Sequence, residues 1–381
     1  MPTSWPDPDE QKGVINLPAL LGAPLVTNAL ALVTKTVSPA ILAYPLSLRV
    51  DTNGKTQYSS DAAAVTNCYW PSGNPHCTTP AQVLPYLQPD VASCIQPNVL
   101  GLNYDDGPSS TVQNGGNAST QDLAVQLATM NQNATFFVTG ASTYYNPQVL
   151  KDLYTAGHEI SVHSWSHAPM TSLTNQEIVA EIKYTEALIY SIIGRKPRYF
   201  RAPYGDVDDR VRAIAGALGY ENVLWGQDKD SGDSEGAPTE AAVVAQFTSW
   251  NKPQPGFIDL EHSLDVNSNT WAIAVLKYFQ AQKAAGTMAL TLMPVGQCQG
   301  KSAYVDLTGA ALPNPPPQPM TVTRVVPGAT ATGKPSGPGA ASAAPAATPA
   351  AAAASGPSNS GARVQTGAGA VVAALAAALL A

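Results

Sequence analysis

Charged side chains are scarce in this sequence. Asp, Glu, Lys and Arg make up 12% of its 381 residues, about half of the roughly 25% usual in soluble domains. The 27 acidic residues outnumber the 20 basic ones, and the net charge of −7 argues against a nucleic-acid-binding protein, which usually presents a basic patch. No apolar run reaches the roughly 18 to 20 residues of a membrane-spanning helix. A hydrophobic content of 44% is nevertheless enough to bury a sizeable core.

Cysteine is scarce too, and no C-x-x-C pair occurs, so a zinc knuckle is not expected. The four cysteines are Cys68, Cys77, Cys94 and Cys298. An even number is compatible with two disulfides in an oxidising compartment. Two Asn-x-Ser/Thr sequons, at Asn117 and Asn133, are candidate glycosylation sites.

The two ends of the chain differ from its middle. The N-terminus, MPTSWPDPDEQK, lacks the basic region and apolar run of a signal peptide. Either a signal peptide has been removed from this numbering, or the gene model starts too late to include one. Residues 1–97 show no regular alternation of elements and are predicted to form a loop-rich N-terminal extension.

The C-terminal stretch is built from small residues. Residues 301–362 are rich in Pro, Ala, Gly, Ser and Thr and predict a disordered stalk that suits O-glycosylation. A small-residue cluster, a short polar spacer and an apolar tail follow, and this pattern is typical of a GPI-anchor signal over 363–381, with attachment at Asn359. The alternative is an Ala-rich terminal helix or a low-complexity tail. The pattern predicts an extracellular protein at the cell wall and the outer face of the plasma membrane, with a lipid anchor as its only membrane contact.

Between these ends, over 98–300, short apolar runs alternate with longer helical patterns, which predicts parallel βαβ units. The expected strands are 99–104, 134–138, 159–163, 198–201, 223–226, 257–262 and 288–293. The expected helices are 120–131, 147–156, 174–193, 208–218, 239–248 and 269–285. Without a dinucleotide-binding glycine fingerprint, the pattern favours an α/β fold with a distorted, incomplete (β/α) barrel of about seven parallel strands.

Polar side chains follow five of these strands. They are Asp105 and Asp106, His163 and His167, Arg201, Asp228 and Asp230, and His262. Taken singly, Asp-Asp-Gly-Pro is a turn sequence, two histidines four residues apart are often not a metal site, and a histidine that ends a strand is usually a buried, hydrogen-bonded residue. Because the active site of a parallel βα barrel lies at the carboxyl ends of its strands, their joint occurrence there indicates catalysis.

The same segments resemble the motifs of a known family. YDDGP, HSWSH, FRAPYG and the Leu-x-His of FIDLEHSLD resemble the first, second, third and fifth motifs of the NodB-like polysaccharide deacetylases, carbohydrate esterase family four. The resemblance covers about residues 98–296 and is closest to fungal chitin deacetylases, which are secreted and often GPI-anchored.

The resemblance implies roles for individual residues. Asp105 corresponds to the general base, and Arg201 would orient it. Asp106, His163 and His167 would bind one divalent ion, usually zinc, with cobalt as an alternative. His262 would be the general acid. The substrate would contact Tyr204 through its backbone N–H, Leu260 through the acetyl methyl group, and Trp225.

Two motifs depart from the family pattern. Asn103-Tyr104 stands where Thr-Phe is usual, and little effect is expected because these positions are structural. The fourth motif, usually Asp-x-x-Asp-Trp, has no Asp-Trp in WGQDKDSGDSEG. Asp228 is predicted to tune His262, with Asp230 as the alternative, and the absence of the Trp is expected to alter one wall of the sugar-binding groove.

Spacing suggests how the cysteines pair. Cys68 and Cys77 flank a turn-rich stretch, YWPSGNPH, and are expected to pair with each other. Cys94 precedes the first strand and Cys298 follows the last. These strands are neighbours in a closed barrel, so the second disulfide is expected to join Cys94 to Cys298.

The sequence therefore predicts a monomeric, metal-dependent enzyme that removes N-acetyl groups from chitin or chito-oligosaccharides. Two alternatives remain open. One keeps the chemistry and changes the substrate to acetylxylan or another acetylated polysaccharide, and the other is an inactive wall-binding relative.

Overall fold

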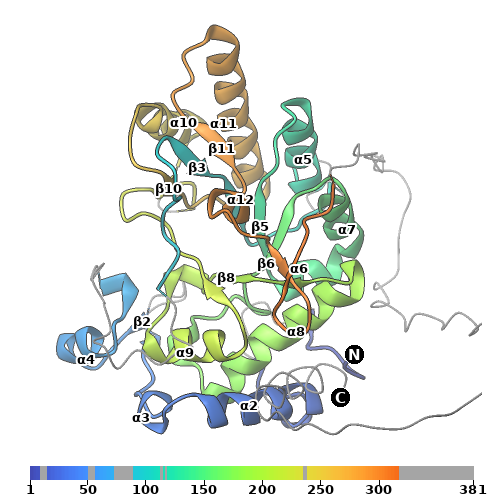
Figure 1. Ribbon diagram of the computed structural model, residues 1–381, viewed down its shortest axis with the longest axis vertical. Coiled ribbons are helices and arrows are strands. Elements are labelled where there is room, and N and C mark those ends of the chain that lie inside the picture. Colours follow the sequence, from blue (N-terminus) through green and yellow to red (C-terminus); the bar gives the residue numbers. More distant parts are fainter. Residues whose placement is uncertain are drawn as a thin grey trace, which may run out of the picture.

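The computed structural model describes residues 1–8, 15–49, 56–72, 89–111, 115, 118–234 and 238–316. Parallel strands lie at the centre of the molecule and helices pack around them (Figure 1). The predicted α/β class with a parallel sheet is therefore confirmed.

The larger sheet has five parallel strands in the order β4-β5-β6-β8-β9. They are β4 (Asn103–Asp105), β5 (Thr135–Val138), β6 (Glu159–Val162), β8 (Tyr199–Phe200) and β9 (Glu221–Asn222). The first four are buried along their whole length. Such burial explains why these segments lack the apolar–polar alternation of strands with one face in water.

A smaller parallel sheet continues from the larger one. Its order is β10-β3-β11, and its strands are β10 (Phe257–Ile258), β3 (Val99–Gly101) and β11 (Thr291–Met293). The predicted strand 99–104 is thus divided at Leu102 into β3 and β4. The backbone of Leu102 joins the two sheets, because its N–H donates to Met293 O (2.8 Å) and its carbonyl accepts from Thr135 N (3.0 Å).

The loop after β9 is hydrogen-bonded to the segment that extends β10. Leu260 N donates to Lys229 O (3.0 Å), and Ser231 N donates to Leu260 O (3.1 Å). On the other side, an isolated parallel bridge pairs Asp105 with His262. The end of β4 and the segment after β10 are therefore neighbours, which brings polar residues from distant parts of the sequence to one end of the barrel.

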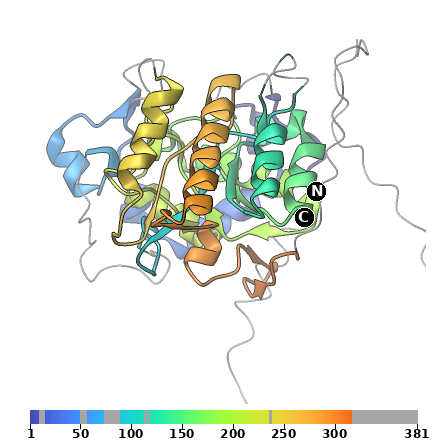
Figure 2. The ribbon, with the colours of Figure 1, turned by 90° about the horizontal axis from the view of Figure 1, so that it is seen from above.

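Helices follow the strands where the sequence predicts them. They are α5 (Thr120–Thr129), α7 (Pro147–Thr155), α8 (Asn175–Ile193), α9 (Asp209–Ala217), α10 (Glu240–Trp250) and α11 (Val266–Ala285), with the short unpredicted α6 (Gly140–Tyr145) and α12 (Val295–Cys298). Helices α10 (yellow), α11 (orange) and α5 (green) stand side by side along one flank (Figure 2). A capping box, in which Thr174 and Glu177 satisfy each other's backbone amides, begins α8.

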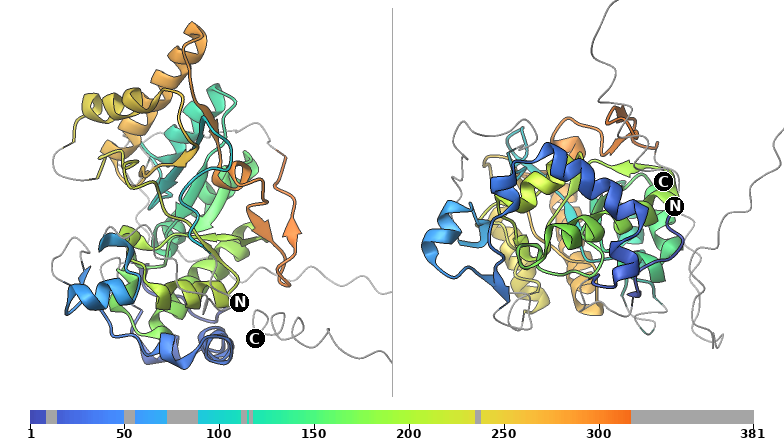
Figure 3. Two further views of the ribbon diagram at one scale, coloured as in Figure 1. Left: turned by 60° about the vertical axis from the view of Figure 1, so that its left-hand side comes forward. Right: turned by 90° about the horizontal axis from the view of Figure 1, so that it is seen from below.

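The described part of the N-terminal extension is more helical than predicted. Four helices are present: α1 (Pro18–Leu21), α2 (Pro24–Thr36), α3 (Pro39–Leu42) and α4 (Asp61–Thr66). A short antiparallel pair, β1 (Leu48–Arg49) and β2 (Thr56–Gln57), precedes α4. Prolines stand in the first turns of α1, α2 and α3, where a missing N–H costs nothing, and Pro24 begins α2. Helix α2 crosses α8 and buries Val26, Ala29 and Val33 (Figure 3).

The predicted boundary between catalytic domain and stalk is also wrong. Strands β12 (Tyr304–Val305) and β13 (Ala311–Leu312) form an antiparallel sheet with β7 (Lys196–Pro197), so part of the predicted 301–362 stalk belongs to the folded domain. The reason is Tyr304, which is fully buried and whose hydroxyl accepts a hydrogen bond from Ile160 N at 2.9 Å. The rest of the predicted stalk and the predicted anchor signal lie outside the described residues.

A disulfide joins Cys94 to Cys298, as predicted. It connects the segment before β3 to α12 after β11, and these two strands pair in parallel as the closed-barrel argument requires. Cys68 is disulfide-bonded as well. Its predicted partner, Cys77, lies outside the described residues.

Replacing Cys298 with serine is expected to lower the free energy of unfolding by about 2–5 kcal/mol. The bond closes a loop with a sequence separation of 204, and long loops lose the most chain entropy in the unfolded state when they are cross-linked. Urea unfolding of the variant and the parent protein measures the difference. An unchanged midpoint and slope would show that the bond contributes nothing to stability.

Candidate active site

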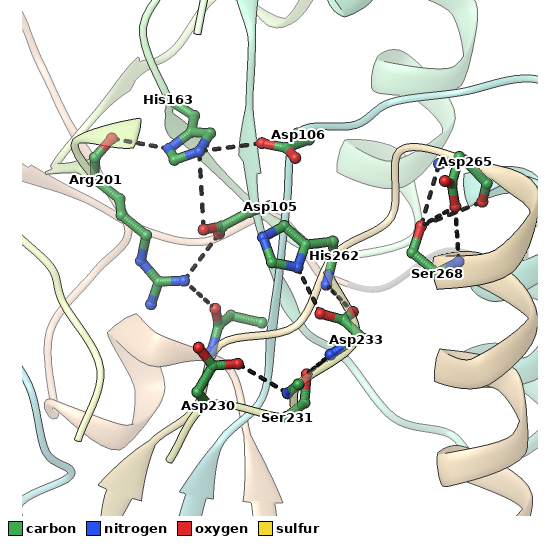
Figure 4. A network of polar contacts seen from close by, with 12 residues as sticks. Asp105, Asp106, His163, Arg201, Asp230, Ser231, Asp233, His262, Asp265 and Ser268 are labelled. Carbon is green, nitrogen blue, oxygen red and sulfur yellow. Dashed lines mark hydrogen bonds and ion pairs between the residues drawn. The ribbon is translucent and has the colours of Figure 1, made fainter. Parts of the chain in front are cut away.

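Most of the polar residues singled out in the sequence meet at the carboxyl end of the parallel strands, and Figure 4 shows Asp105, Asp106, His163, Arg201 and His262 there. Asp105 ends β4 and Asp106 follows it; His163 follows β6 and Arg201 follows β8. His262 lies four residues beyond the end of β10. The position agrees with the general placement of active sites in βα barrels.

Asp106, His163 and His167 form the one cluster in the described chain with the ligand types and spacing to hold a metal ion. Their candidate ligand atoms all lie within 4.8 Å of one another. Asp106 Oδ1 is 3.2 Å from His163 Nε2 and 3.0 Å from His167 Nε2. Two imidazoles and one carboxylate are the donor set of many catalytic zinc sites, which leave a fourth position open.

The tautomer of His163 supports this use. Its Nδ1 lies 2.9 Å from Arg201 O, and a carbonyl can only accept, so Nδ1 carries the proton and Nε2 presents its lone pair to Asp106. Asp106 Oδ1 is buried and receives no hydrogen bond from the described residues. Acceptors that face each other without a proton between them are stabilised by a cation, so the residues fit a metal ion.

Asp105 occupies the position of a base beside this cluster. It is 2% exposed, and its Oδ2 lies 3.8 Å from His163 Nε2. Arg201 Nη1 donates to Asp105 Oδ1 at 2.8 Å, so the guanidinium holds the carboxylate in one orientation. Burial lowers the pKa of Arg201, and Asp105 opposes that effect.

Asn103 has a closer connection to the site than the sequence analysis expected. Its Oδ1 accepts from Arg201 Nη1 at 2.5 Å, and its Nδ2 donates to Asp259 Oδ1 at 2.7 Å. All three side chains are fully buried. Asn103 therefore helps to position the guanidinium that orients Asp105. Burial raises the pKa of Asp259 well above its usual range.

His262 is paired with Asp233, and the prediction of Asp228 is wrong. His262 Nδ1 donates to Asp233 Oδ1 at 2.7 Å, and the backbone N–H of His262 donates to Asp233 Oδ2 at 2.8 Å. The Asp228 side chain is 83% exposed and pairs with Lys229 instead. The alternative, Asp230, accepts from Gly232 N at 2.8 Å. The missed signal was the spacing Asp230-x-x-Asp233, which keeps the fourth motif with Ser234 in place of its Trp.

Asp233→Asn is expected to move the alkaline limb of the activity–pH profile to lower pH by about one unit or more. Burial lowers the pKa of His262, but Asp233 outweighs it and raises that pKa to about 10. The raised pKa keeps the imidazole protonated up to that pH. Without the negative charge of Asp233, His262 loses its proton at a lower pH. Asp228→Asn is the matched control, because that exposed carboxylate pairs with Lys229. Superimposable profiles for Asp233→Asn and the parent protein would contradict the assignment.

The predicted substrate contacts differ in how accessible they are. Tyr204 is 40% exposed, has a left-handed backbone (φ 60°) and places its ring 4.5 Å from that of His167. Leu260 is 7% exposed, and Trp225 is 8% exposed. Trp70, from the N-terminal extension, packs against Trp225 with ring centroids 4.7 Å apart. Trp225 is therefore largely covered, and its ring packs against Arg201.

Of the predicted glycosylation and lipid-attachment sites, the structure describes only Asn133. Asn133 lies between α5 and β5, and its Nδ2 donates to Ala156 O at 3.0 Å. Asn117 and Asn359 lie outside the described residues.

Comparison with known proteins shows which family the central part of the chain resembles. Residues 93–223 match the family model for polysaccharide deacetylase. Over this segment the chain is similar to the polysaccharide deacetylases, so the resemblance of its motifs to the NodB-like family is confirmed.

Among curated proteins, this chain is similar to chitin deacetylases. Chitin deacetylase 1 of Cryptococcus neoformans var. grubii is 36% identical over 269 residues, covering 65% of this chain and 53% of the relative. The chitin deacetylase of Amylomyces rouxii is 33% identical over 234 residues, covering 59% and 52%. The chain thus spans about half the length of these relatives.

Solved structures are similar as well. The chitin deacetylase from the fungal pathogen Colletotrichum lindemuthianum aligns with a TM-score of 0.47 and 24% identity, covering 57% of this chain and 95% of that one. The Bc1960 peptidoglycan N-acetylglucosamine deacetylase aligns with a TM-score of 0.49 and 22% identity, covering 57% and 94%.

Proposed function

We propose that this protein hydrolyses the N-acetyl groups of chitin or chito-oligosaccharides and releases acetate, leaving glucosamine residues in the polymer. The observation that carries the proposal is the arrangement of Asp105 and His262 beside the Asp106–His163–His167 cluster. Figure 4 shows Asp105, Asp106, His163 and His262 of this arrangement. The relatives named chitin deacetylases support the choice of substrate.

Asp106, His163 and His167 would hold one divalent ion, with Zn²⁺ preferred over Co²⁺ for a site of two imidazoles and a carboxylate. Such an ion, when bound, supplies positive charge that polarises a substrate oxygen and makes a water molecule more acidic. The hydrogen bond from His163 Nδ1 to Arg201 O keeps the ring turned toward that position.

Asp105 and His262 divide the proton transfers. Asp105, held by Arg201, accepts the proton of the attacking water. His262 donates a proton to the leaving nitrogen, because an amine leaves readily only after it is protonated. Asp233 keeps the imidazole charged until that step and fixes its orientation. Backbone N–H groups near Tyr204 are the candidate donors to the developing oxyanion.

Acetate release from glycol-chitin, compared with acetylxylan under the same conditions, tests the substrate. We expect release from glycol-chitin and little from acetylxylan, with Asp105→Asn as the background control. Release from acetylxylan alone would support the esterase alternative. No release from either, by protein that binds metal, would favour an inactive wall-binding relative.

We also propose that the protein is extracellular and GPI-anchored near Asn359. The support is the order of small residues, spacer and apolar tail in 358–381. Within the part of the chain that the structure describes, no helix is long and apolar enough to cross a membrane. Phosphatidylinositol-specific phospholipase C should release the protein from membranes. Protein found free in the medium with its C-terminal peptide intact would rule the anchor out.

Glycosylation at Asn117 and Asn133 remains part of the proposal. Thr135 of the second sequon is fully buried in β5, so a glycan on Asn133 must be added before this strand is in place. Mass spectrometry before and after deglycosylation measures occupancy, and unmodified peptides covering both sites would contradict it. We take the enzyme to act as a monomer, which light scattering of the purified protein tests.

A further inference from the structure

The loop that carries two of the candidate metal ligands has an unfavourable backbone. Between His163 and His167 the chain reads Ser164-Trp165-Ser166, and both Ser164 (φ 62°) and His167 (φ 56°) adopt left-handed conformations. Non-glycine residues adopt this region at a conformational cost, and they persist there only where surrounding contacts hold them. Something in the fold must therefore stabilise this loop.

The stabilising group is the carboxylate of Glu181, on α8. Its Oε2 accepts hydrogen bonds from the backbone N–H groups of Trp165 and Ser166, both at 2.8 Å. Its Oε1 accepts from Ser166 Oγ at 2.7 Å and from Ile15 N at 3.3 Å. Glu181 is fully buried, and these four donors match the acceptor capacity of one ionised carboxylate. Three of the four belong to the loop between the histidines.

The N-terminal extension takes part in the same arrangement. Ile15 provides the fourth hydrogen bond, and the ring of Trp5 stacks on that of Trp165 with centroids 6.1 Å apart. Trp165 itself is 1% exposed and fills the space above Gly140, where an added Cβ would lie 2.2 Å from its ring. The loop is thus held by Glu181 of α8 and by the N-terminal segment, which stacks Trp5 on Trp165.

We propose that Glu181 is a positioning residue for the metal centre, which sets the separation and direction of His163 and His167 by holding the backbone between them. The inference rests on the proposed function, in that it requires an ion at Asp106, His163 and His167. His163 is also oriented by Arg201 O, whereas the backbone N–H of His167 donates to Ser164 Oγ at 3.1 Å, inside the loop. His167 therefore depends more on Glu181 than His163 does.

The test is the affinity of the full chain for Zn²⁺, measured by titration against a competing chelator. Glu181→Gln places an NH₂ group where an oxygen accepted hydrogen bonds, so donor faces donor at the loop. Affinity should fall by about 10- to 100-fold, the usual loss when a group that orients metal ligands is changed. The absorption spectrum of the Co²⁺-loaded variant should change as well, because ligand directions alter.

Glu186→Gln is the matched control. Glu186 lies on the same helix and is fully buried, but its partners are Lys183 and Tyr220, away from the loop. Its replacement should destabilise the fold without changing the affinity for Zn²⁺. Equal losses of affinity in the two variants would mean that Glu181 acts through general stability, and would overturn the inference.

Ser166→Ala removes one of the four hydrogen bonds to Glu181. This variant tests the role of Glu181 if Glu181→Gln does not fold. A smaller loss of Zn²⁺ affinity in the same direction is expected. Parent-like affinity in every folded loop or Glu181 variant would overturn the role of Glu181 and leave the proposed function intact. A parent protein that binds no Zn²⁺ would instead remove the proposed metal site, and with it this inference.

Discussion

Replacement of His163 by alanine is expected to abolish metal binding and deacetylation together. The side chain is 2% exposed, lies 3.2 Å from Asp106 Oδ1 through its Nε2, and is fixed by Arg201 O through its Nδ1. Removing it leaves two protein ligands, fewer than the three that catalytic zinc sites retain. The affinity for Zn²⁺ should fall by more than about 100-fold, the upper end of the loss seen when only an orienting partner of a ligand is changed.

His158→Ala controls for the loss of a buried histidine. His158 is also 2% exposed, and burial lowers its pKa to about 4, so it is neutral like a ligand. Its Nδ1 accepts from Ala134 N at 3.2 Å, and it is not part of the metal cluster. This variant should lose stability and keep its metal. If His163→Ala retained full activity after dialysis against a chelator, the metal assignment would be wrong.

Asp105→Asn is expected to leave the metal bound and to reduce turnover by a factor of about 10² or more, the usual size of a general-base contribution. Asparagine has the shape of aspartate but cannot take a proton from water. Its amide can still accept from Arg201 Nη1, so the main change is chemical. Turnover number and bound metal should be measured on the same preparation.

His262→Ala should produce a comparable loss from the acid side, because it removes the group that Asp233 holds protonated. Asp228→Asn is again the control, and it should have parent-like turnover because its side chain is exposed. A near-native rate in Asp105→Asn or His262→Ala, with metal content unchanged, would contradict this division of roles.

The sequence by itself predicted most of the residues that meet in the site. Apolar runs mark the parallel strands, and the residues after each run reach the same end of a barrel whatever lies between them. Asp105, Asp106, His163, Arg201 and His262 could therefore be assigned without coordinates. The Cys94–Cys298 pair followed from the same reasoning, since the first and last strands are neighbours.

The sequence also predicted the helices that follow these strands, because their apolar periodicity and caps are local. Local sequence patterns predicted the structure less accurately at the two ends of the domain. Helix α2 begins at Pro24, and its buried face depends on α8, which lies far along the chain. Tyr304 is held by contacts to Ile160, which composition cannot reveal in a stretch rich in small residues.

Only the tertiary structure decided which side chains support the site. Three aspartates lie within six residues of one another after β9. The hydrogen bond from Ser231 N to Leu260 O sets the path of this loop. That path turns Asp233 toward His262 and leaves Asp228 in solvent. Asn103 and Glu181 have no motif of their own, because their function lies in contacts to Arg201 and to the backbone of Trp165 and Ser166. Hydrogen bonds of this kind join residues by position in space, so neither periodicity nor spacing could predict them.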